Sequence, residues 1–377
     1  MSKTKAVTKK NSVAHEPFVR MSKRDGLPIW KSFGVRLIGL ALALIICAII
    51  IFALTKLNPI KVYAAMFNGT FGTKKRIWVT IRDIMMLLCI SVGLAPAFKM
   101  RFWNIGAEGQ VLVGGIVAAA CMINLGNTLP LVPLMIVMFL GSAVAGGIWG
   151  GIPAVFKAKW GANETLFTLM MNYIAIQLTS FFVALWEHPF GSNSVGIINP
   201  TSKAGWFPPI FGQAYTLNVI IVLSLTILMF VYLKYTKHGY EIAVVGESEN
   251  TARYAAINVR QVIIRSMIIS GAICGIAGFL AVSGASHTIS TSTAGGRGFT
   301  AIIIAWLAQF NSFVMILISA LIVFLERGAI EIASQFQLND YVSEMITGII
   351  LFFILGSEFF INYKVKFRSA KNKEGRK

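Results

Sequence analysis

The sequence predicts an all-α integral membrane protein with nine to ten membrane crossings. Of its 377 residues, 56% are hydrophobic and only 13% are charged, and the mean hydropathy is +0.72. A soluble domain of this composition would lack the polar surface needed to cover itself, so lipid is expected to be its main solvent. The third observation is a series of apolar runs, each close to the roughly 20 residues that an α-helix needs to cross a bilayer.

No hydrophilic stretch between these runs is long enough to fold by itself. We expect one transmembrane domain over residues 36–361, which includes a polar loop at 235–263, and basic tails at 1–35 and 362–377. The formal charge of +19 is concentrated in the tails and loops, which suits a membrane surface better than nucleic acid. The four cysteines lie in separate apolar runs without a nearby histidine, so no metal site is expected.

The apolar runs place the membrane crossings along the chain. The expected spans are 36–55, 79–98, 105–125, 131–151, 165–186, 216–234, 264–284 and 341–361. Residues 299–325 form a further apolar stretch, interrupted at Asn311 and Ser312. As one helix it gives nine crossings with the two termini on opposite sides of the membrane, and as two helices it gives ten with both on the same side. Both tails are basic and basic residues collect on the cytoplasmic side, so we expect ten crossings, cytoplasmic termini and a short or re-entrant leg at 299–310.

Motifs of enzymes and ATPases are missing from the sequence. It has no glycine-rich phosphate loop ending in Gly-Lys-Ser/Thr, no His-Glu-x-x-His pair and no Gly-x-Ser-x-Gly turn. We therefore expect that the chain is not an enzyme and binds no ATP of its own.

The longest polar loop, residues 235–263, carries the start of a short helix. Ser248 is suited to cap it by accepting a bond from a backbone N–H two or three residues later, and Glu249 suits the positive end of the helix dipole. A helix of about nine residues is marginal alone in water, so it is expected to pack against something else. It either rests on the bilayer surface or docks a partner that drives the protein, and these residues alone favour the first.

A second group of polar residues lies at the start of the third span, within Arg101–Gln110. Asn104 and Glu108 are one helical turn apart and share a face, while Gly106 and Gly109 would let another backbone come close. A carboxylate at membrane depth is costly unless it is paired. Glu108 is therefore either part of a functional site or a structural group that bonds to a backbone and holds a broken helix together.

A polar stripe follows the fifth span, which begins after Gly161-Ala-Asn-Glu-Thr165. Thr165, Thr168, Asn172 and Thr179 recur at helical spacing on this otherwise apolar segment. Such a stripe either bonds between helices, which is the default, or lines a watery path. Neutral amides and hydroxyls would suit an uncharged polyhydroxyl solute. The residues that we expect along such a path are Asn104, Glu108, Gln110, Asn163, Glu164, Thr168 and Asn172.

Three segments of the chain together carry a resemblance to a known family. They are Phe102–Gln110, Gly161–Thr165 with Met171–Ile174, and Gly246–Ile257. In this order they resemble the permease subunit of bacterial nucleoside and simple-sugar ABC importers, a relative of the branched-chain amino acid permeases. The likeness covers about residues 36 to 360, and Trp103, Thr251 and Ala256 depart from the residues that are frequent in the family.

The resemblance implies the channel-forming subunit of an ATP-binding-cassette importer, which translocates nucleosides, with guanosine as one candidate, or related simple sugars across the bacterial cytoplasmic membrane. It implies three partners: an ABC ATPase that binds ATP-Mg, a second and distinct permease, and an extracellular substrate-binding lipoprotein. No cofactor is expected in this chain. The residues expected to couple to the ATPase are Gly246, Glu247, Asn250, Ala252, Arg253, Tyr254 and Ala255.

The alternative function is an ion-coupled secondary transporter that acts without an ATPase. It would need ionisable groups deep among the helices to carry its driving ion. Glu108, Glu164, Glu344 and Glu358 lie near the ends of the expected spans, which disfavours this alternative. A membrane scaffold that transports nothing is the third possibility.

Overall fold

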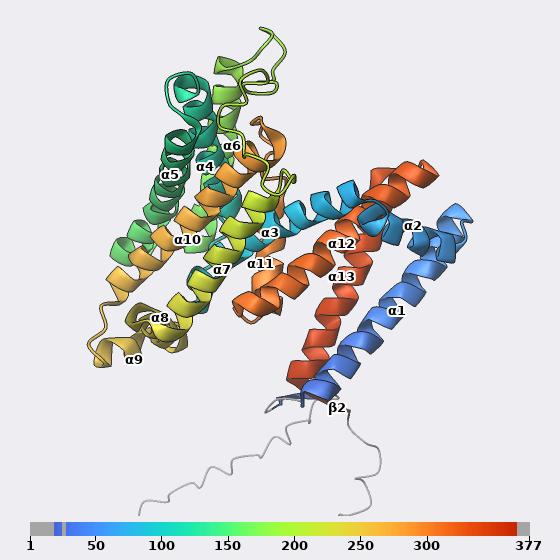
Figure 1. Cartoon of the computed structure of the whole chain (residues 1–377). Helices are drawn as coiled ribbons and strands as arrows, with labels where there is room; N and C mark the ends of the chain where they lie inside the picture. The colour runs from blue at the N-terminus through green and yellow to red at the C-terminus, as the bar shows by residue number, and fades with distance from the viewer. Residues whose placement is uncertain (1–18, 25–27, 368–377) are drawn as a thin grey trace, which may run out of the picture. The chain divides into compact units, whose positions relative to one another are not determined.

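The chain is built almost entirely of α-helices in the computed structural model, which describes residues 19–24 and 28–367 (Figure 1). It divides into two compact units. One is formed by the two ends of the chain, residues 1–61 and 344–377, and the other by residues 62–343.

The first unit joins the two ends of the chain. It contains helix α1 (Ile29–Thr55), most of α13 (Asp340–Asn362) and two antiparallel strands, β1 (Val19–Lys23) and β2 (Tyr363–Phe367). The helices approach closely at Gly39, where an added Cβ would lie 2.8 Å from that of Ser357. The strands fall in segments that the sequence assigned to the two tails, whose remaining residues lie mostly outside the described part.

The second unit holds most of α2 and the helices from α3 to α12. They are α2 (Pro59–Phe71), α3 (Lys74–Lys99), α4 (Ala107–Leu125), α5 (Leu131–Trp160), α6 (Glu164–Leu185), α7 (Thr216–Tyr235), α8 (Lys237–Glu247), α9 (Glu249–Tyr254), α10 (Val259–Ala281), α11 (Arg297–Leu307) and α12 (Ser312–Phe336). A turn of π-helix, η1 (Val282–Ser286), extends α10.

Within the described residues, seven helices are long and apolar enough to cross a membrane: α3 to α7, α10 with η1, and α12. Shorter apolar segments occur in α1, α11 and α13. Each predicted span coincides with one of these helices, so the predicted class of α-helical membrane protein is confirmed.

The structure also resolves the alternative at residues 299–325. Helix α11 ends at Leu307, α12 begins at Ser312, and the Asn311 side chain accepts a bond from the N–H of Phe313 at 3.0 Å. The predicted split into two helices is confirmed. Helix α12 extends beyond the apolar stretch, to Phe336, and includes the charged residues Glu326 and Arg327. These charges are tolerated inside the helix because Arg327 is paired with Asp83 of α3.

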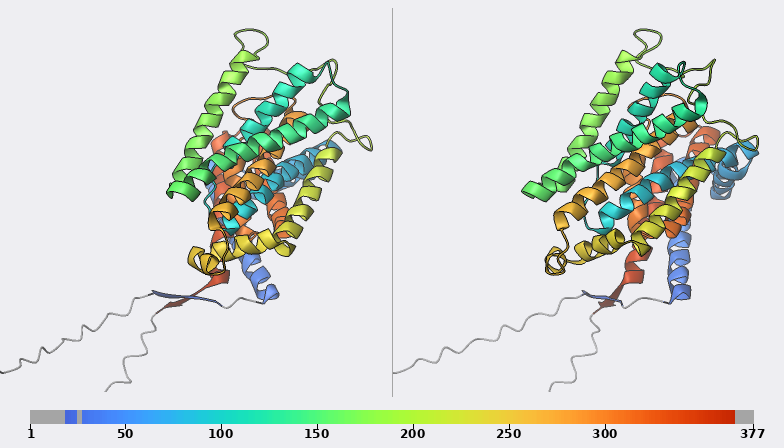
Figure 2. Two further views of the ribbon diagram at one scale, coloured as in Figure 1. Left: turned by 90° about the vertical axis from the view of Figure 1, so that its left-hand side faces the viewer. Right: turned by 60° about the vertical axis from the view of Figure 1, so that its left-hand side comes forward.

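Helix α10 lies at the centre of the second unit, where most of its residues are buried between α3, α4 and α5 (Figure 2). Small residues make this packing close. A Cβ at Gly271 would overlap with the carbonyl oxygen of Gly146 in α5, and one at Gly278 would overlap with that of Val111 in α4. The Ser142 hydroxyl donates to the carbonyl of Gly114 at 2.8 Å. Without a hydrophobic driving force in lipid, such backbone approach and bonding hold helices together.

We expect the substitution G271A to lower the thermal unfolding temperature of the detergent-solubilised protein. The added methyl group would push α10 away from α5, and overpacking of this kind costs roughly 1–3 kcal/mol. The matched control is G348A, because no atom lies within 4 Å of a Cβ added at Gly348. An unfolding temperature of G271A equal to that of G348A would contradict the close packing.

Candidate functional site

A non-helical segment separates α3 from α4, and five of the seven predicted path residues lie at or next to this break. They are Asn104, Glu108, Gln110, Thr168 and Asn172. Residues 100–106 are non-helical, and Arg101 has a left-handed backbone with φ of 60°. The ring of Trp103 stacks on Trp306 of α11, with ring centroids 5.4 Å apart. Asn104 is fully buried next to this turn. A buried backbone without helical bonds needs partners from elsewhere in the protein.

Two amide side chains tie the break to α10. The side-chain oxygen of Asn104, Oδ1, accepts from the backbone N–H of Gly106 at 3.0 Å and from the side-chain amide of Gln110 at 3.3 Å. The Asn104 amide nitrogen donates to the hydroxyl of Ser270 in α10, also at 3.3 Å. The buried amides of Asn104 and Gln110 therefore bond mainly to each other and to the adjacent helix.

The polar stripe of α6 supplies further partners for the break. Asn172 accepts from the N–H of Gly109 and donates to the carbonyl of Ile105, both at 2.8 Å. The Thr168 hydroxyl accepts from the N–H of Ile105 at 3.2 Å. Thr179 lies seven residues beyond Asn172 on α6. Among the described residues, its hydroxyl bonds only within its own helix, where it donates to the carbonyl of Ala175. These contacts match the default interpretation of the stripe, which was hydrogen bonding between helices.

Glu108 bonds to the start of α11. Its two carboxylate oxygens accept from the N–H groups of Gly296 and Gly298 at 2.7 and 2.8 Å. The negative charge also suits the positive end of the α11 dipole. Gly298 is required here, because a Cβ at this position would lie 2.5 Å from the backbone nitrogen of Glu108. This arrangement matches the structural alternative for Glu108, in which it holds a broken helix.

The other two predicted path residues lie apart from the break, at the turn between α5 and α6. Asn163 caps α6 by accepting from the N–H groups of Thr165 and Leu166. Glu164 forms an ion pair with Lys157 at 2.7 Å. All seven predicted residues thus have protein partners, and their role in a solute path remains a prediction.

Helices α8 and α9 lie together at one end of the second unit (Figure 1). Ser248 ends α8 and caps α9, where its hydroxyl accepts from the N–H of Thr251 at 3.3 Å. The predicted cap is confirmed, although α9 has six residues rather than about nine. Gly246 lies so close to the end of α3 that a Cβ would overlap with the carbonyl oxygen of Lys99. A movement of α8 toward α3 would therefore displace the end of α3.

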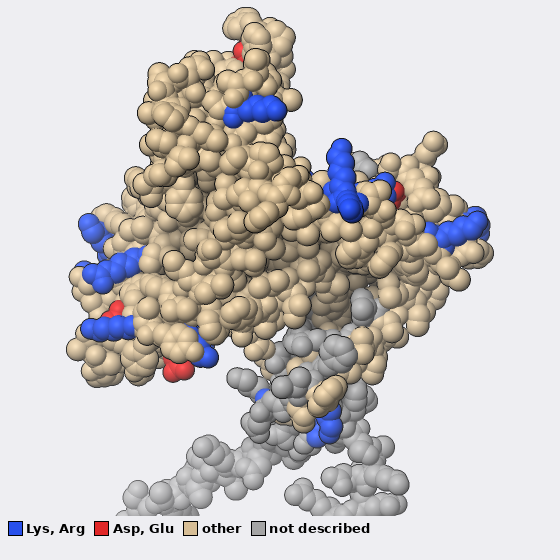
Figure 3. Space-filling view, viewed as in Figure 1, with Lys and Arg blue, Asp and Glu red and all other residues tan. Residues whose placement is uncertain are grey.

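The predicted coupling residues divide into buried and exposed sets. Gly246 and Ala252 are buried, whereas Glu247, Asn250, Arg253, Tyr254 and Ala255 are exposed. The Tyr254 side chain is 94% exposed. A cavity of about 510 Å³ on one side of α9 is lined by charged residues that include Lys157, Glu249, Arg253 and Arg260. Figure 3 shows lysine and arginine side chains gathered around this end, while the flanks of the long helices show few.

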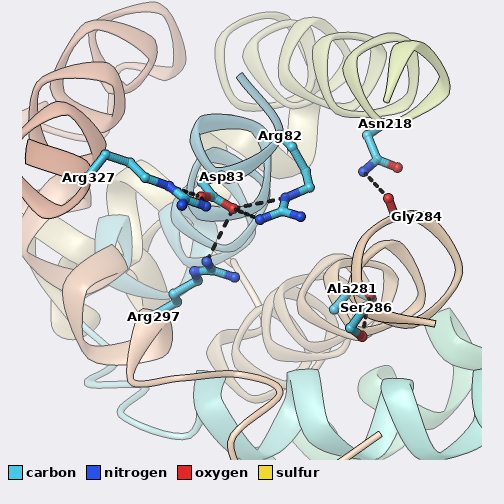
Figure 4. A network of polar contacts seen from close by, with 8 residues as sticks. All are labelled: Arg82, Asp83, Asn218, Ala281, Gly284, Ser286, Arg297 and Arg327. Atoms are coloured by element: carbon cyan, nitrogen blue, oxygen red, sulfur yellow. Dashed lines mark hydrogen bonds and ion pairs between the residues drawn. The ribbon is translucent and has the colours of Figure 1, made fainter. Parts of the chain in front are cut away.

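An ion-pair cluster inside the helices was missed from the sequence. Asp83, on α3, is 4% exposed and accepts bonds from three arginines, Arg82, Arg297 and Arg327 (Figure 4). The charge pair Arg82-Asp83 lies inside the predicted span 79–98, and that position was the signal that could have revealed it. Asp83 is thus a buried ionisable group among the helices, in addition to Glu108, Glu164, Glu344 and Glu358 near the ends of the expected spans.

The fold and these sites define a polytopic α-helical membrane protein. The chain belongs to the family described as branched-chain amino acid transport system / permease component, whose model matches residues 77–355. The family is that of a transport permease component and not of an enzyme, as the missing catalytic motifs predicted.

Relatives of known name agree with this assignment. The chain is 30% identical to the guanosine ABC transporter permease protein NupP of Bacillus subtilis, over 83% of this chain and 88% of that protein. It is 27% identical to the glucose ABC transporter permease protein TsgB13 of Haloferax volcanii, over 92% of this chain and 93% of that protein. It is also 27% identical to the nucleoside ABC transporter permease protein NupB of Lactococcus lactis, over 85% and 90%. No solved structure matches the chain. All three relatives are ABC permeases, so the ion-coupled alternative is set aside.

We expect N172L, which keeps the approximate shape of the side chain, to destabilise the protein. It would leave the N–H of Gly109 and the carbonyl of Ile105 buried without partners, and each such group costs about 1–3 kcal/mol. T179V is the matched control, because the Thr179 hydroxyl bonds only within its own helix. Thermal unfolding in detergent measures both variants, and equal unfolding temperatures would contradict the role of Asn172 in holding the break.

A pH dependence follows from His238 in α8. Burial lowers the pKa of His238, with Glu241 opposing the shift and Arg265 adding to it. Its Nε2 atom is buried without a partner within the described residues. The unfolded chain therefore binds more protons than the folded one, and stability falls as the pH drops below the usual histidine value of about 6.5.

We expect the unfolding temperature to fall less between about pH 7.5 and 5.5 in H238N than in the unsubstituted protein. H188N is the control for the same substitution at an exposed histidine. Identical profiles for H238N and the unsubstituted protein would show that His238 does not titrate in this way.

Proposed function

We propose that this chain is the channel-forming subunit of an ATP-binding-cassette importer for nucleosides, with guanosine as the first candidate, or for related simple sugars. The observation that carries this proposal is its likeness to the guanosine permease NupP over 88% of that protein's length. The matches to the nucleoside permease NupB and the glucose permease TsgB13 favour the same solute classes.

In this proposal, the chain crosses the cytoplasmic membrane ten times and has both termini in the cytoplasm. The break between α11 and α12 supports an even number of crossings, with α11 as a short leg packed within the protein. The end that carries α8 and α9 is also assigned to the cytoplasm. Its support is the basic set Lys234, Lys237, Arg253, Arg260 and Arg265, because basic residues collect on the cytoplasmic side.

Helix α9 is the proposed docking point for a separate ATPase that binds ATP-Mg. A short helix with an exposed Tyr254 and Arg253 beside a charged cavity of about 510 Å³ is suited to enter a partner's surface. The contact of Gly246 with the carbonyl of Lys99 supplies a route by which a push on α8 and α9 reaches α3. A second, related permease would complete the pore, and an extracellular lipoprotein would deliver the solute.

Reconstitution of the complete transporter in proteoliposomes tests this function. Uptake of radiolabelled guanosine, uridine and glucose is measured with ATP inside the vesicles, and again with a non-hydrolysable ATP analogue. We expect ATP-dependent uptake of at least one of these solutes. Uptake that proceeds without the ATPase subunit, or the absence of uptake for all three, would contradict the proposal.

We expect Y254A and the double variant E247A/R253A to lose ATPase binding while the permease remains folded. Tyr254 is nearly fully exposed, so its removal affects a partner surface rather than the core. Y173A is the matched control, because Tyr173 is a similarly exposed tyrosine on the span α6. Co-purification of the ATPase in detergent, with an unfolding measurement on each variant, gives the result. Undiminished co-purification of both α9 variants would rule out docking at α9.

A further inference from the structure

We propose that the arginines around Asp83 form a solute-contact site on the translocation path, which binds oxygen acceptors of the transported nucleoside or sugar. The inference rests on the proposed import function for its ligand class. The site itself is identified from the geometry of the cluster in Figure 4.

Three arginines from three helices converge on one buried carboxylate. Arg82 of α3 donates to Asp83 through Nε at 3.1 Å and through Nη2 at 3.0 Å. Arg327 of α12 donates through Nε at 2.7 Å and through Nη2, and Arg297 at the start of α11 donates at 3.4 Å. The two oxygens of Asp83 thus receive five N–H donors, which exceeds the roughly four lone-pair sites of a carboxylate.

The cluster has more positive than negative groups. Glu326 also interacts electrostatically with Arg297 and Arg327. Within the described residues, the cluster therefore contains three guanidinium groups and two carboxylates, Asp83 and Glu326. A guanidinium carries five N–H donors and no acceptor. In the described part of the chain, the Nη1 atoms of Arg82, Arg297 and Arg327 have no protein acceptor. The cluster therefore has donors available for another molecule.

The side chains that carry these free donors are only partly buried. The side chains of Arg82, Arg297 and Arg327 are 19%, 29% and 27% exposed, whereas that of Asp83 is 5% exposed. Lipid tails cannot accept hydrogen bonds, and an unpaired charge facing them costs several kcal/mol. The exposed sides of the three arginines are therefore expected to border a hydrated space among α3, α7, α11 and α12.

Tyr215 at the start of α7 adds an aromatic surface to the site. Arg82 lies over the ring of Tyr215, with 5.3 Å from its central carbon to the ring centroid. Asn218, one turn further along, bonds to the carbonyl of Gly284 at 3.4 Å and does not bond to the cluster (Figure 4). The site thus offers several N–H donors and an aromatic face.

These groups match an uncharged polyhydroxyl or carbonyl-bearing solute. The guanidinium donors suit carbonyl or hydroxyl oxygens, and a planar guanidinium can bind two neighbouring acceptors at once. The Tyr215 ring supplies a surface on which a nucleobase or a sugar ring can pack. The surplus positive charge disfavours cations in the same space.

Arg82 is the residue of choice for a test. Its hydrogen bonds run to the adjacent residue of its own helix, so its loss removes no hydrogen bond between elements and only the contact with the Tyr215 ring. In contrast, Asp83 links three helices, and its replacement would leave several charges uncompensated. The matched control is Arg76, which pairs α3 with Glu331 of α12 at 2.9 Å outside the cluster.

We expect R82Q to raise the KM for guanosine uptake by the complete transporter about tenfold, which corresponds to one lost charged hydrogen bond. R82K should lie between R82Q and the unsubstituted protein, because an ammonium keeps the charge but not the planar fork. R76Q should change the KM less than about twofold. Glucose uptake serves as the second probe. An unchanged KM in R82Q would overturn the inference.

A labelling experiment keeps the test independent of the solute. R82C is introduced after replacement of the native cysteines and treated with a membrane-impermeant, hydrophilic thiol reagent in proteoliposomes. We expect labelling at least tenfold faster than that of I148C, whose site is exposed on the apolar flank of α5, and slower labelling when guanosine is present. Absence of labelling would overturn the inference even if uptake is normal. Labelling of R82C, combined with no uptake of guanosine or glucose by the unsubstituted transporter, would support the hydrated site and contradict the proposed solute class instead.

Discussion

Non-helical backbone inside a membrane domain must find its hydrogen-bond partners within the protein, because hydrocarbon supplies none. The second unit meets this requirement twice. The segment between α3 and α4 is held by Asn104, Thr168 and Asn172, and the start of α11 is held by Glu108. Both groups of bonds involve residues 104–109. This short stretch therefore fixes the positions of α3, α4, α6 and α11 relative to one another.

A framework fixed in this way can transmit force. Helices α4, α5 and α10 meet through glycines and allow little sliding, since a methyl group at Gly271 or Gly278 already has no room. The end of α3 touches α8 through Gly246, and Asp83 lies about 24 Å further along the same helix at a rise of 1.5 Å per residue. In the proposed mechanism, α3 connects the ATPase contact at one end to the arginine cluster near the other.

The sequence predicted the positions of the helices well, because long apolar runs leave few alternatives in a membrane. It also predicted the break at Asn311 and the cap at Ser248, which depend on local chemistry. It left two interpretations open for Glu108 and for the stripe of α6. Deciding between them needs partners such as Gly296, 188 residues away in the chain, and one sequence without homologues does not pair such distant residues.

The arginine cluster and the strand pair were not predicted for related reasons. Arg82, Asp83, Arg297 and Arg327 are spread over more than 200 residues, and Arg297 and Arg327 each lie near the end of an apolar run, where a single charge is unremarkable. The strands β1 and β2 pair residues from opposite ends of the chain. Both strands do alternate apolar and polar residues, VRMSK in β1 and YKVKF in β2, but each pattern covers only five residues inside a basic tail and was overlooked.

The central claim, that side chains satisfy the broken backbone at residues 100–109, can be measured directly by hydrogen–deuterium exchange in lipid nanodiscs. We predict slow exchange for the amides of Ile105, Gly106, Gly109, Gly296 and Gly298, comparable to that of the buried centre of α10. Slow exchange is expected even though Ile105, Gly106 and Gly296 lie outside helices. Exchange as fast as in the exposed loop at residues 190–194 would contradict it, and would indicate instead that water reaches this backbone.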